Sequence, residues 1–246
     1  RSALAEPLWS PSPERAGATR LASFLAEQAR ASGGRVCDAA TLQRHAIADP
    51  ARFWADVWRF TGIKGEMGPE PHIEAPGRVA EARLFPRGAL NFAENLLLPA
   101  LNGTVRRDSD AIVFRGERDV QRRLTWGELV ELVGGVQRAL AEVGVTTGER
   151  VAAVLPNLPE AIAGMLGTAS IGAVWSSCSP DFGVQGVLDR FGQIEPRVLF
   201  AADGYFYAGK RIDIADKLAE ILAGLPTVER VIIVSYIGRA SAVAER

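Results

Sequence analysis

Residues 151–177 read VAAVLPNLPEAIAGMLGTASIGAVWSS. An apolar run is followed by a turn at Pro156, a segment of helical length that ends near Gly172, and a second apolar run. A strand, a helix and a strand in this order are joined by a right-handed crossover, which makes the two strands parallel. Because the apolar runs are nearly continuous rather than alternating, we expect both strands to be buried on both faces.

The same order of elements continues on either side of this unit. We predict further strands at residues 198–202 and 231–235, and helices at residues 125–143, 184–194 and 212–223. Thr125 and Glu128 have the spacing of a capping box, which marks the start of the first of these helices. An apolar strand at residues 111–114, followed by a polar turn, precedes it. The predicted fold class is α/β, a parallel sheet layered with helices.

The first hundred residues follow a different pattern. We predict a helix at residues 17–31, a helix beginning at Asp49 and Pro50, and a short helix capped by Asn91. The second of these carries several aromatic residues, interpreted as core. Residues 62–88 are rich in Gly, Pro and charge and are expected to be irregular. We therefore predict a mainly helical amino-terminal cap at residues 1–105 and a first, incomplete α/β sheet subdomain at 106–246.

The composition excludes several classes of protein. The 246 residues include 28 basic and 29 acidic side chains, with no long run of one sign, so we expect no nucleic-acid partner. No window is apolar enough for a membrane span. The amino terminus lacks the apolar core of a secretory signal, which favours a cytoplasmic location. The first residue is not Met, and processing or truncation would each explain this. The sequence says nothing about the oligomeric state.

Cysteine and histidine are scarce. Cys37 and Cys178 are far apart and fit no metal-ligand or CxxC spacing, so we expect two reduced thiols. His45 and His72 are the only histidines, and we predict no metal site. Cys178 has no histidine close by in sequence that could activate it as a nucleophile.

In parallel sheets, ligands bind beyond the carboxyl ends of the strands. Three segments are placed there: residues 156–160, 177–183 and 203–210. The second contains Ser179, Pro180 and Asp181 before a predicted helix. This turn has two interpretations that can coexist. Its backbone could form an anion-binding nest, or Ser179 or Asp181 could simply cap the helix.

Residues 204–210 read GYFYAGK and match the first positions of a phosphate-binding P-loop. Arg211 stands where that loop needs Ser or Thr, and bulky residues fill its middle, so we reject a P-loop here. Lys210 and Arg211 are then either phosphate-binding cations or solvated charges that open the next helix. No dinucleotide fingerprint and no G-x-S-x-G motif is present.

Two stretches, residues 155–161 and 169–175, resemble the adenylate-forming acyl-CoA synthetases, in which a P-N-x-P-E-like turn opens a helix before a G-A-V strand. Residues 176–196 resemble the acetoacetate-activating branch of that family. Residues 91–96 and the pair Phe53 and Trp54 are similar to its amino-terminal segment.

The resemblance implies a two-step reaction with acetoacetate, ATP, Mg²⁺ and CoA as the small-molecule partners. Acetoacetate and ATP would give an acyl-adenylate and pyrophosphate, and CoA would then displace AMP. The family's phosphate-binding loop, magnesium glutamate, ribose aspartate and carboxy-terminal lysine are not found in this sequence. We therefore expect no catalytic residue up to Arg246 and no activity from this chain alone.

The resemblance implies only a few site residues in this sequence, and all of them are expected to bind CoA. Ser179, Pro180 and Asp181 match the family's strand-end turn, and Lys210 matches a basic position expected near the CoA 3′-phosphate. A neighbouring arginine of the family falls at Tyr207, and its paired glycines fall at Pro180 and Asp181. Two alternatives stay open: a ligase for another short-chain acid, and a non-catalytic module that binds a nucleotide or a partner.

Overall fold

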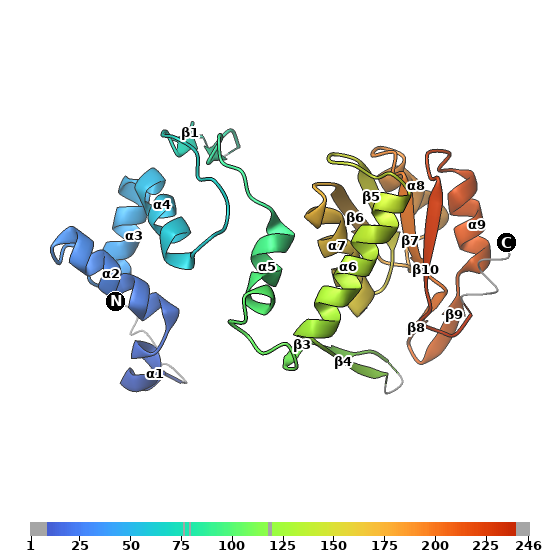
Figure 1. Cartoon of the computed structure of the whole chain (residues 1–246), viewed down its shortest axis with the longest axis horizontal. Coiled ribbons are helices and arrows are strands. Elements are labelled where there is room, and N and C mark those ends of the chain that lie inside the picture. The colour runs from blue at the N-terminus through green and yellow to red at the C-terminus, as the bar shows by residue number, and fades with distance from the viewer. Residues whose placement is uncertain (1–8, 76, 79, 118–119, 240–246) are drawn as a thin grey trace, which may run out of the picture. The chain divides into compact units, whose positions relative to one another are not determined.

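The computed structural model describes residues 9–75, 77–78, 80–117 and 120–239. The chain divides into two compact units, residues 1–90 and 91–246 (Figure 1). Helix α5 (Phe92–Leu101) packs through Ala93 and Leu97 with the helices of the second unit, although we expect it in the amino-terminal segment. The division of the chain after residue 105 stays a prediction.

The first unit is mainly helical. Its elements are α1 (Pro13–Gly17), α2 (Arg20–Ser32), α3 (Ala39–Ala48), α4 (Pro50–Thr61), β1 (Ile73–Glu74) and β2 (Arg83–Leu84). The side chain of Asp49 accepts a hydrogen bond from the Arg52 N–H, which confirms the helix start at Asp49 and Pro50. Helix α3 was not predicted, although Asp38 and Thr41 form a capping box at its start.

Aromatic side chains of α2 and α4 pack together in the core of this unit. The ring of Phe24 lies 6.2 Å from that of Phe53 and 4.9 Å from that of Phe60. Trp58 is buried, but Trp54 is 42% exposed. The interpretation of the α4 aromatics as core is therefore wrong for Trp54, because this side chain lies on the outer side of the helix.

The second unit is built on a parallel sheet of four strands with the order β10-β7-β5-β6. The strands are β5 (Arg150–Val154), β6 (Val174–Cys178), β7 (Val198–Ala202) and β10 (Arg230–Val234). All adjacent pairs are parallel, which confirms the predicted sheet. Five consecutive residues of β7 are buried, as expected for a strand covered on both faces.

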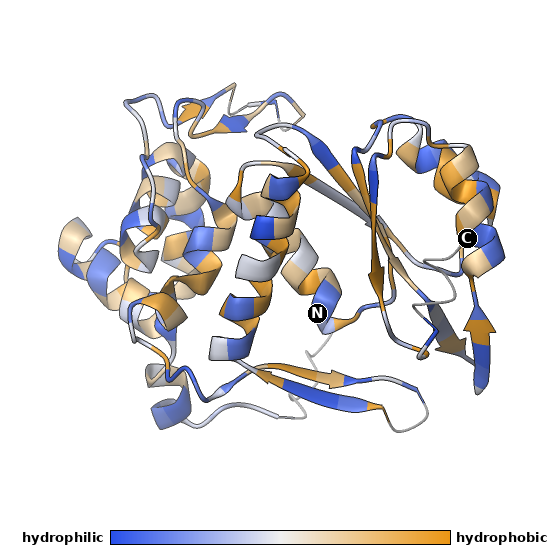
Figure 2. Cartoon of the chain, turned by 45° about the vertical axis from the view of Figure 1, so that its right-hand side comes forward, coloured by the Kyte–Doolittle hydropathy of each residue, from blue (hydrophilic) through white to orange (hydrophobic). Residues whose placement is uncertain are grey.

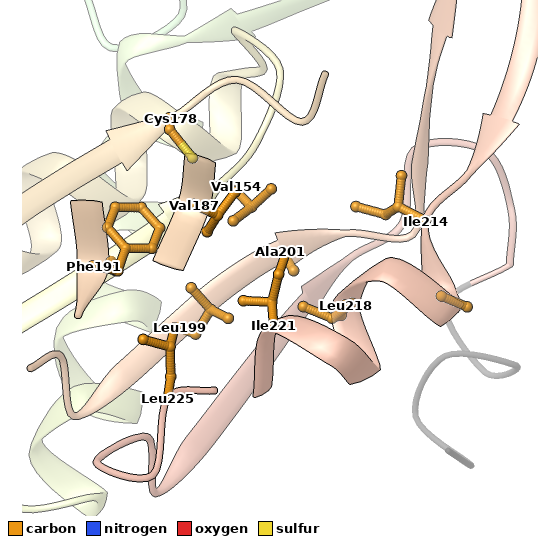
Figure 3. Packing of buried hydrophobic residues seen from close by; sticks show 12 residues of the cluster. Val154, Cys178, Val187, Phe191, Leu199, Ala201, Ile214, Leu218, Ile221 and Leu225 are labelled. Carbon is orange, nitrogen blue, oxygen red and sulfur yellow. The ribbon is translucent and has the colours of Figure 1, made fainter. Parts of the chain in front are cut away.

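Successive residues of β5 point to different layers of core. Ala152 and Val154 pack with α8 (Val184–Phe191) and α9 (Ala215–Ala223), as Figure 3 shows around Val154. Val151 and Ala153 lie in the other cluster, with Leu140 of α6 (Trp126–Glu142). Helix α7 (Pro159–Ser170) packs against α6. These helices carry hydrophobic and hydrophilic residues on different faces (Figure 2).

Two antiparallel hairpins accompany the sheet. The strand predicted at residues 111–114 is confirmed as part of the first hairpin, but its pairing partner and the second hairpin were not predicted. One joins β3 (Asp110–Arg115) to β4 (Gln121–Thr125). The other joins β8 (Gly204–Tyr207) to β9 (Lys210–Asp213), with Ala208 and Gly209 at its turn, both at positive φ. The helix predicted from residue 212 therefore begins only at Ala215. Lys210 and Arg211 belong to a strand, so the interpretation that they open a helix is wrong.

Candidate functional site

A cavity of about 470 Å³ lies at the carboxyl ends of the parallel strands. It is lined by residues of three segments placed there from the sequence and by a residue that follows β10: Pro156, Asn157, Ser177, Cys178, Ser179, Pro180, Asp181, Tyr205, Phe206, Tyr207 and Tyr236. This volume falls in the range of small-molecule sites. The cavity is therefore the candidate functional site of the second unit.

The turn after β6 forms one wall of this cavity. Ser179 and Asp181 are exposed and Pro180 is buried. The following helix, α8, has Gly183 as its N-cap, and no side chain caps it. The alternative in which Ser179 or Asp181 caps the helix is therefore wrong, because the chain continues for two residues beyond Asp181 before the helix begins. An anion-binding nest in this turn stays a prediction.

Lys217 of α9 was not predicted as part of this site, yet it contacts the turn. Its Nζ donates hydrogen bonds to the carbonyl oxygens of Pro180 and Phe182. Burial lowers the pKa of Lys217, while the negative charge of Asp181 acts in the opposite direction. The ammonium is also 5.7 Å from the centre of the Tyr205 ring.

The opposite wall is aromatic and comes from β8 and from the chain after β10. Tyr205, Phe206 and Tyr207 follow one another in β8, and the ring of Phe206 lies 5.3 Å from that of Tyr236 in an edge-to-face arrangement. Burial raises the pKa values of Tyr205 and Tyr236. Both phenols are therefore neutral near pH 7, and the wall offers ring faces and hydroxyl groups to a ligand.

Cys178 lines the cavity but is buried at the end of β6 (Figure 3). Burial raises the pKa of its thiol to about 11, against the opposing positive charges of Arg190 and Lys217. A thiol is nucleophilic only as the thiolate. This agrees with the expectation that Cys178 is an ordinary reduced thiol.

Asp203 follows β7 and is fully buried beneath the aromatic wall. Its carboxylate accepts hydrogen bonds from the backbone N–H groups of Tyr236 at 2.7 Å and Ile237 at 2.8 Å. Burial alone would raise its pKa, but the backbone donors outweigh this and hold the pKa below its usual value. The negative charge of Asp203 thus fixes the position of Tyr236 in the cavity wall.

The residues proposed for CoA from the family resemblance are only partly brought together. Ser179, Pro180, Asp181 and Tyr207 all line the cavity. Lys210 does not line it; this residue is exposed and pairs with Tyr207 across the β8–β9 hairpin. Among the described residues that line the cavity, only Asp181 is charged, so none of them offers a cationic group to a ligand.

Some of these features had a signal in the sequence. The turn of the β8–β9 hairpin contains Gly209, and two-residue hairpin turns favour Gly because their central residues need positive φ. Lys217 and Asp203 had no such signal, because their contacts join segments that are far apart in the chain.

The described residues contain neither a metal-binding cluster nor a membrane span. No three of their His, Cys, Asp or Glu side chains gather closely enough to bind a metal ion. None of the helices in the described part of the chain is long and apolar enough to cross a membrane.

Known proteins resemble this chain along most of its length. The profile of the family described as "AMP-binding enzyme" matches residues 101–245. The chain is 44% identical to an acetoacetyl-coenzyme A synthetase of Rhizobium meliloti (strain 1021), over 97% of this chain and 35% of that protein. It is 32% identical to the malonamoyl-CoA synthetase vrtB of Penicillium aethiopicum, over 93% of this chain and 31% of that protein.

A solved structure is also similar. The acetoacetyl-CoA synthetase from Streptomyces lividans superposes with a TM-score of 0.83 at 37% identity, over 95% of this chain and 36% of that one. The chain thus spans about a third of the length of the relatives it matches.

Proposed function

Because the chain belongs to the AMP-binding enzyme family, we propose that the complete protein ligates acetoacetate to CoA at the expense of ATP. A carboxylate oxygen of acetoacetate attacks the α-phosphorus of ATP, and pyrophosphate leaves. The thiol sulfur of CoA then attacks the carbonyl carbon of the acyl-adenylate and AMP leaves, which gives acetoacetyl-CoA. The likeness to acetoacetyl-CoA synthetases along 97% of this chain carries the proposal.

We assign the second step, rather than the first, to this part of the protein. The cavity at the strand ends has aromatic walls and no cationic side chain in its lining. Such a lining suits a flat ring, because a nucleobase gains about 1–3 kcal/mol by stacking on an aromatic side chain. It does not suit a triphosphate, since Asp181 would repel it. We assign no residue of this chain to ATP or Mg²⁺.

We therefore propose that the nucleotide end of CoA lies between the turn Ser179, Pro180 and Asp181 and the ring of Tyr207. Tyr207 is 61% exposed, so its ring face is open to a ligand. The 3′-phosphate of this end would approach Lys210, which pairs with Tyr207 in the hairpin, and would keep away from the Asp181 carboxylate. The contacts of CoA with Ser179, Pro180, Asp181, Tyr207 and Lys210 are all part of this proposal.

The first experiment is pyrophosphate release by the complete protein with ATP, Mg²⁺, CoA and one of four acids: acetoacetate, acetate, propionate or butyrate. A clear preference for acetoacetate is the expected result. Release with none of the four, from a folded protein, would contradict the proposed reaction and favour a non-catalytic module.

A second candidate is a ligase for another short acid. It is favoured by the 32% identity to a protein named for malonamoyl-CoA synthesis. Malonamate has an amide where acetoacetate has a methyl ketone, so adding malonamate to the acid panel separates the two substrates.

We also propose a cytoplasmic location, for which the absence of a membrane-spanning helix in the described residues is the support.

A further inference from the structure

The turn between β6 and α8 is held by one side chain from another element. Lys217 Nζ donates to the carbonyl oxygen of Pro180 and, across 3.3 Å, to that of Phe182. These two carbonyls flank Asp181, so the ammonium group bridges the turn at its middle. Lys217 is on α9, 35 residues further along the chain than Phe182.

The turn has few other restraints. Its own backbone contributes a hydrogen bond from the Phe182 N–H to the Ser179 carbonyl at 3.3 Å. Helix α8 begins at Gly183 without a side-chain cap. Within the described residues, both side-chain hydrogen bonds to residues 179–182 come from Lys217. The guanidinium of Arg190 also lies 4.2 Å from the centre of the Phe182 ring, and Pro180 is buried. Removal of Lys217 therefore leaves the conformation of the turn to contacts made close by in the sequence and to the burial of Pro180.

No ion pair with another described residue neutralises the charge of Lys217. In the described part of the chain no carboxylate oxygen lies within 4.0 Å of its ammonium, and the charge is met by two carbonyl dipoles and the face of Tyr205. The charged or titratable groups that act on it from neighbouring elements are Asp181 and Cys178. A half-buried ammonium is costly unless it is well hydrogen-bonded. Its placement here therefore couples the turn tightly to α9.

We propose that Lys217 is a positioning residue for CoA binding. It holds the strand-end turn in the conformation that, together with Tyr205 and Tyr207, shapes the cavity. This proposal rests on the proposed function, because the ligand of the cavity is taken to be CoA. Lys217 acts through the turn, so its loss weakens the CoA-dependent step and leaves acyl-adenylate formation unchanged.

The experiment compares Lys217→Met and Lys217→Arg with the unaltered complete enzyme. Acetoacetate-dependent exchange of labelled pyrophosphate into ATP, without CoA, reports the first step. Full turnover at varied CoA concentration reports the second. We expect Lys217→Met to raise the KM for CoA about tenfold, which corresponds to about 1.4 kcal/mol. The exchange rate and the KM for acetoacetate stay unchanged, and Lys217→Arg, which keeps donors and charge, recovers part of the loss.

Arg30→Met is the control, because it removes an exposed cation of α2 in the first unit, and we expect it to leave both steps unchanged. Hydrogen exchange on the 246-residue chain gives a second readout that needs no activity. In Lys217→Met the amide of Phe182 exchanges faster, while the amides of β7 do not change.

Three results would overturn the proposal: an unchanged KM for CoA, an equal loss in the pyrophosphate exchange step, or an unchanged amide exchange at Phe182. The proposed function fails separately. If the unaltered enzyme shows no acetoacetate-dependent exchange, that function is wrong, and the Phe182 amide still decides whether Lys217 holds the turn.

Discussion

The buried carboxylate of Asp203 accepts a hydrogen bond from the backbone N–H of Ile237 across 2.8 Å. The N–H groups of Tyr236 and Arg239 donate to the same carboxylate at 2.7 and 2.5 Å, and the hydroxyl of Ser235 at 3.3 Å. One side chain at the end of β7 thus gathers four donors of the segment that leaves β10. The backbone N–H groups of this segment thereby find an acceptor, without which they would be unpaired.

We predict that Asp203→Asn lowers the free energy of unfolding by about 3 kcal/mol, because hydrogen bonds to a buried charge are strong and an amide cannot satisfy all the donors. Urea unfolding of the chain measures this. Glu131→Gln is the control, since its 77% exposed side chain makes only a 3.9 Å ion pair with Arg107 and such pairs contribute little. Equal midpoints for both variants would contradict the prediction.

The stability of the second unit should also depend on pH through Asp203. Burial raises its pKa and the backbone donors lower it, with a net decrease from the ordinary value of 3.8. A carboxylate with a lowered pKa in the folded state contributes stability above its unfolded-state pKa, and this is lost as pH falls through the folded-state value. The free energy of unfolding, measured from pH 7 down to pH 3, should therefore change less with pH in Asp203→Asn than in the unaltered chain.

The two cysteines should differ in reactivity. Cys37 is exposed and Cys178 is buried, with the pKa of the Cys178 thiol raised by burial to about 11. At pH 8, iodoacetamide should modify Cys37 and leave Cys178 intact, as seen by mass spectrometry of the digested chain. In urea both should react. Rapid modification of Cys178 in the folded chain would show that the end of β6 opens readily.

Gly204 at the start of β8 has no room for a side chain. An added Cβ would lie 2.3 Å from the Ile212 carbonyl oxygen and 2.4 Å from Cδ1 of Ile237. We expect Gly204→Ala to destabilise the chain by about 1–3 kcal/mol, since a backbone atom of β9 must move. Thermal unfolding measures the effect, and Gly17→Ala, where a Cβ meets nothing within 4 Å, is the control. A neutral Gly204→Ala would mean that the hairpin shifts freely.

Replacing Lys210 tests the phosphate end of the proposed CoA pose. Lys210→Ala in the complete enzyme should raise the KM for CoA severalfold, and the increase should shrink as the salt concentration rises, because exposed charges are screened. Dephospho-CoA should show little difference between the variant and the unaltered enzyme. A constant KM for CoA would remove Lys210 from the site.

The parallel sheet could be predicted from the sequence because each strand carries its own signal. Residues 151–155 and 198–202 are continuous apolar runs, and burial on both faces requires such runs. The capping pair Thr125 and Glu128 fixed the start of α6, and both of its hydrogen bonds are present. Local chemistry thus determined these elements.

The apolar strand β3 was predicted, but the pairing of the hairpin strands was missed because it joins separate segments and one of these strands is polar. In β9 the sequence KRID has no apolar run, and its strand character depends on pairing with β8. Of the site, only the segments at the strand ends were predicted, because the end of each strand can be recognised from neighbouring residues. The contacts of Lys217 with Pro180 and of Asp203 with Ile237 join residues at least 34 positions apart, so no window of sequence contains them.

The order of the strands leaves β6 at the margin of the sheet. Within the described residues β6 pairs with β5 only, so the main-chain groups along its other side are available to a further strand. A strand margin of this kind is a template for growth. We therefore expect two copies of the isolated chain to be able to join their sheets along β6 at high concentration, and a charged substitution at Val174, which is 49% exposed, to keep them apart.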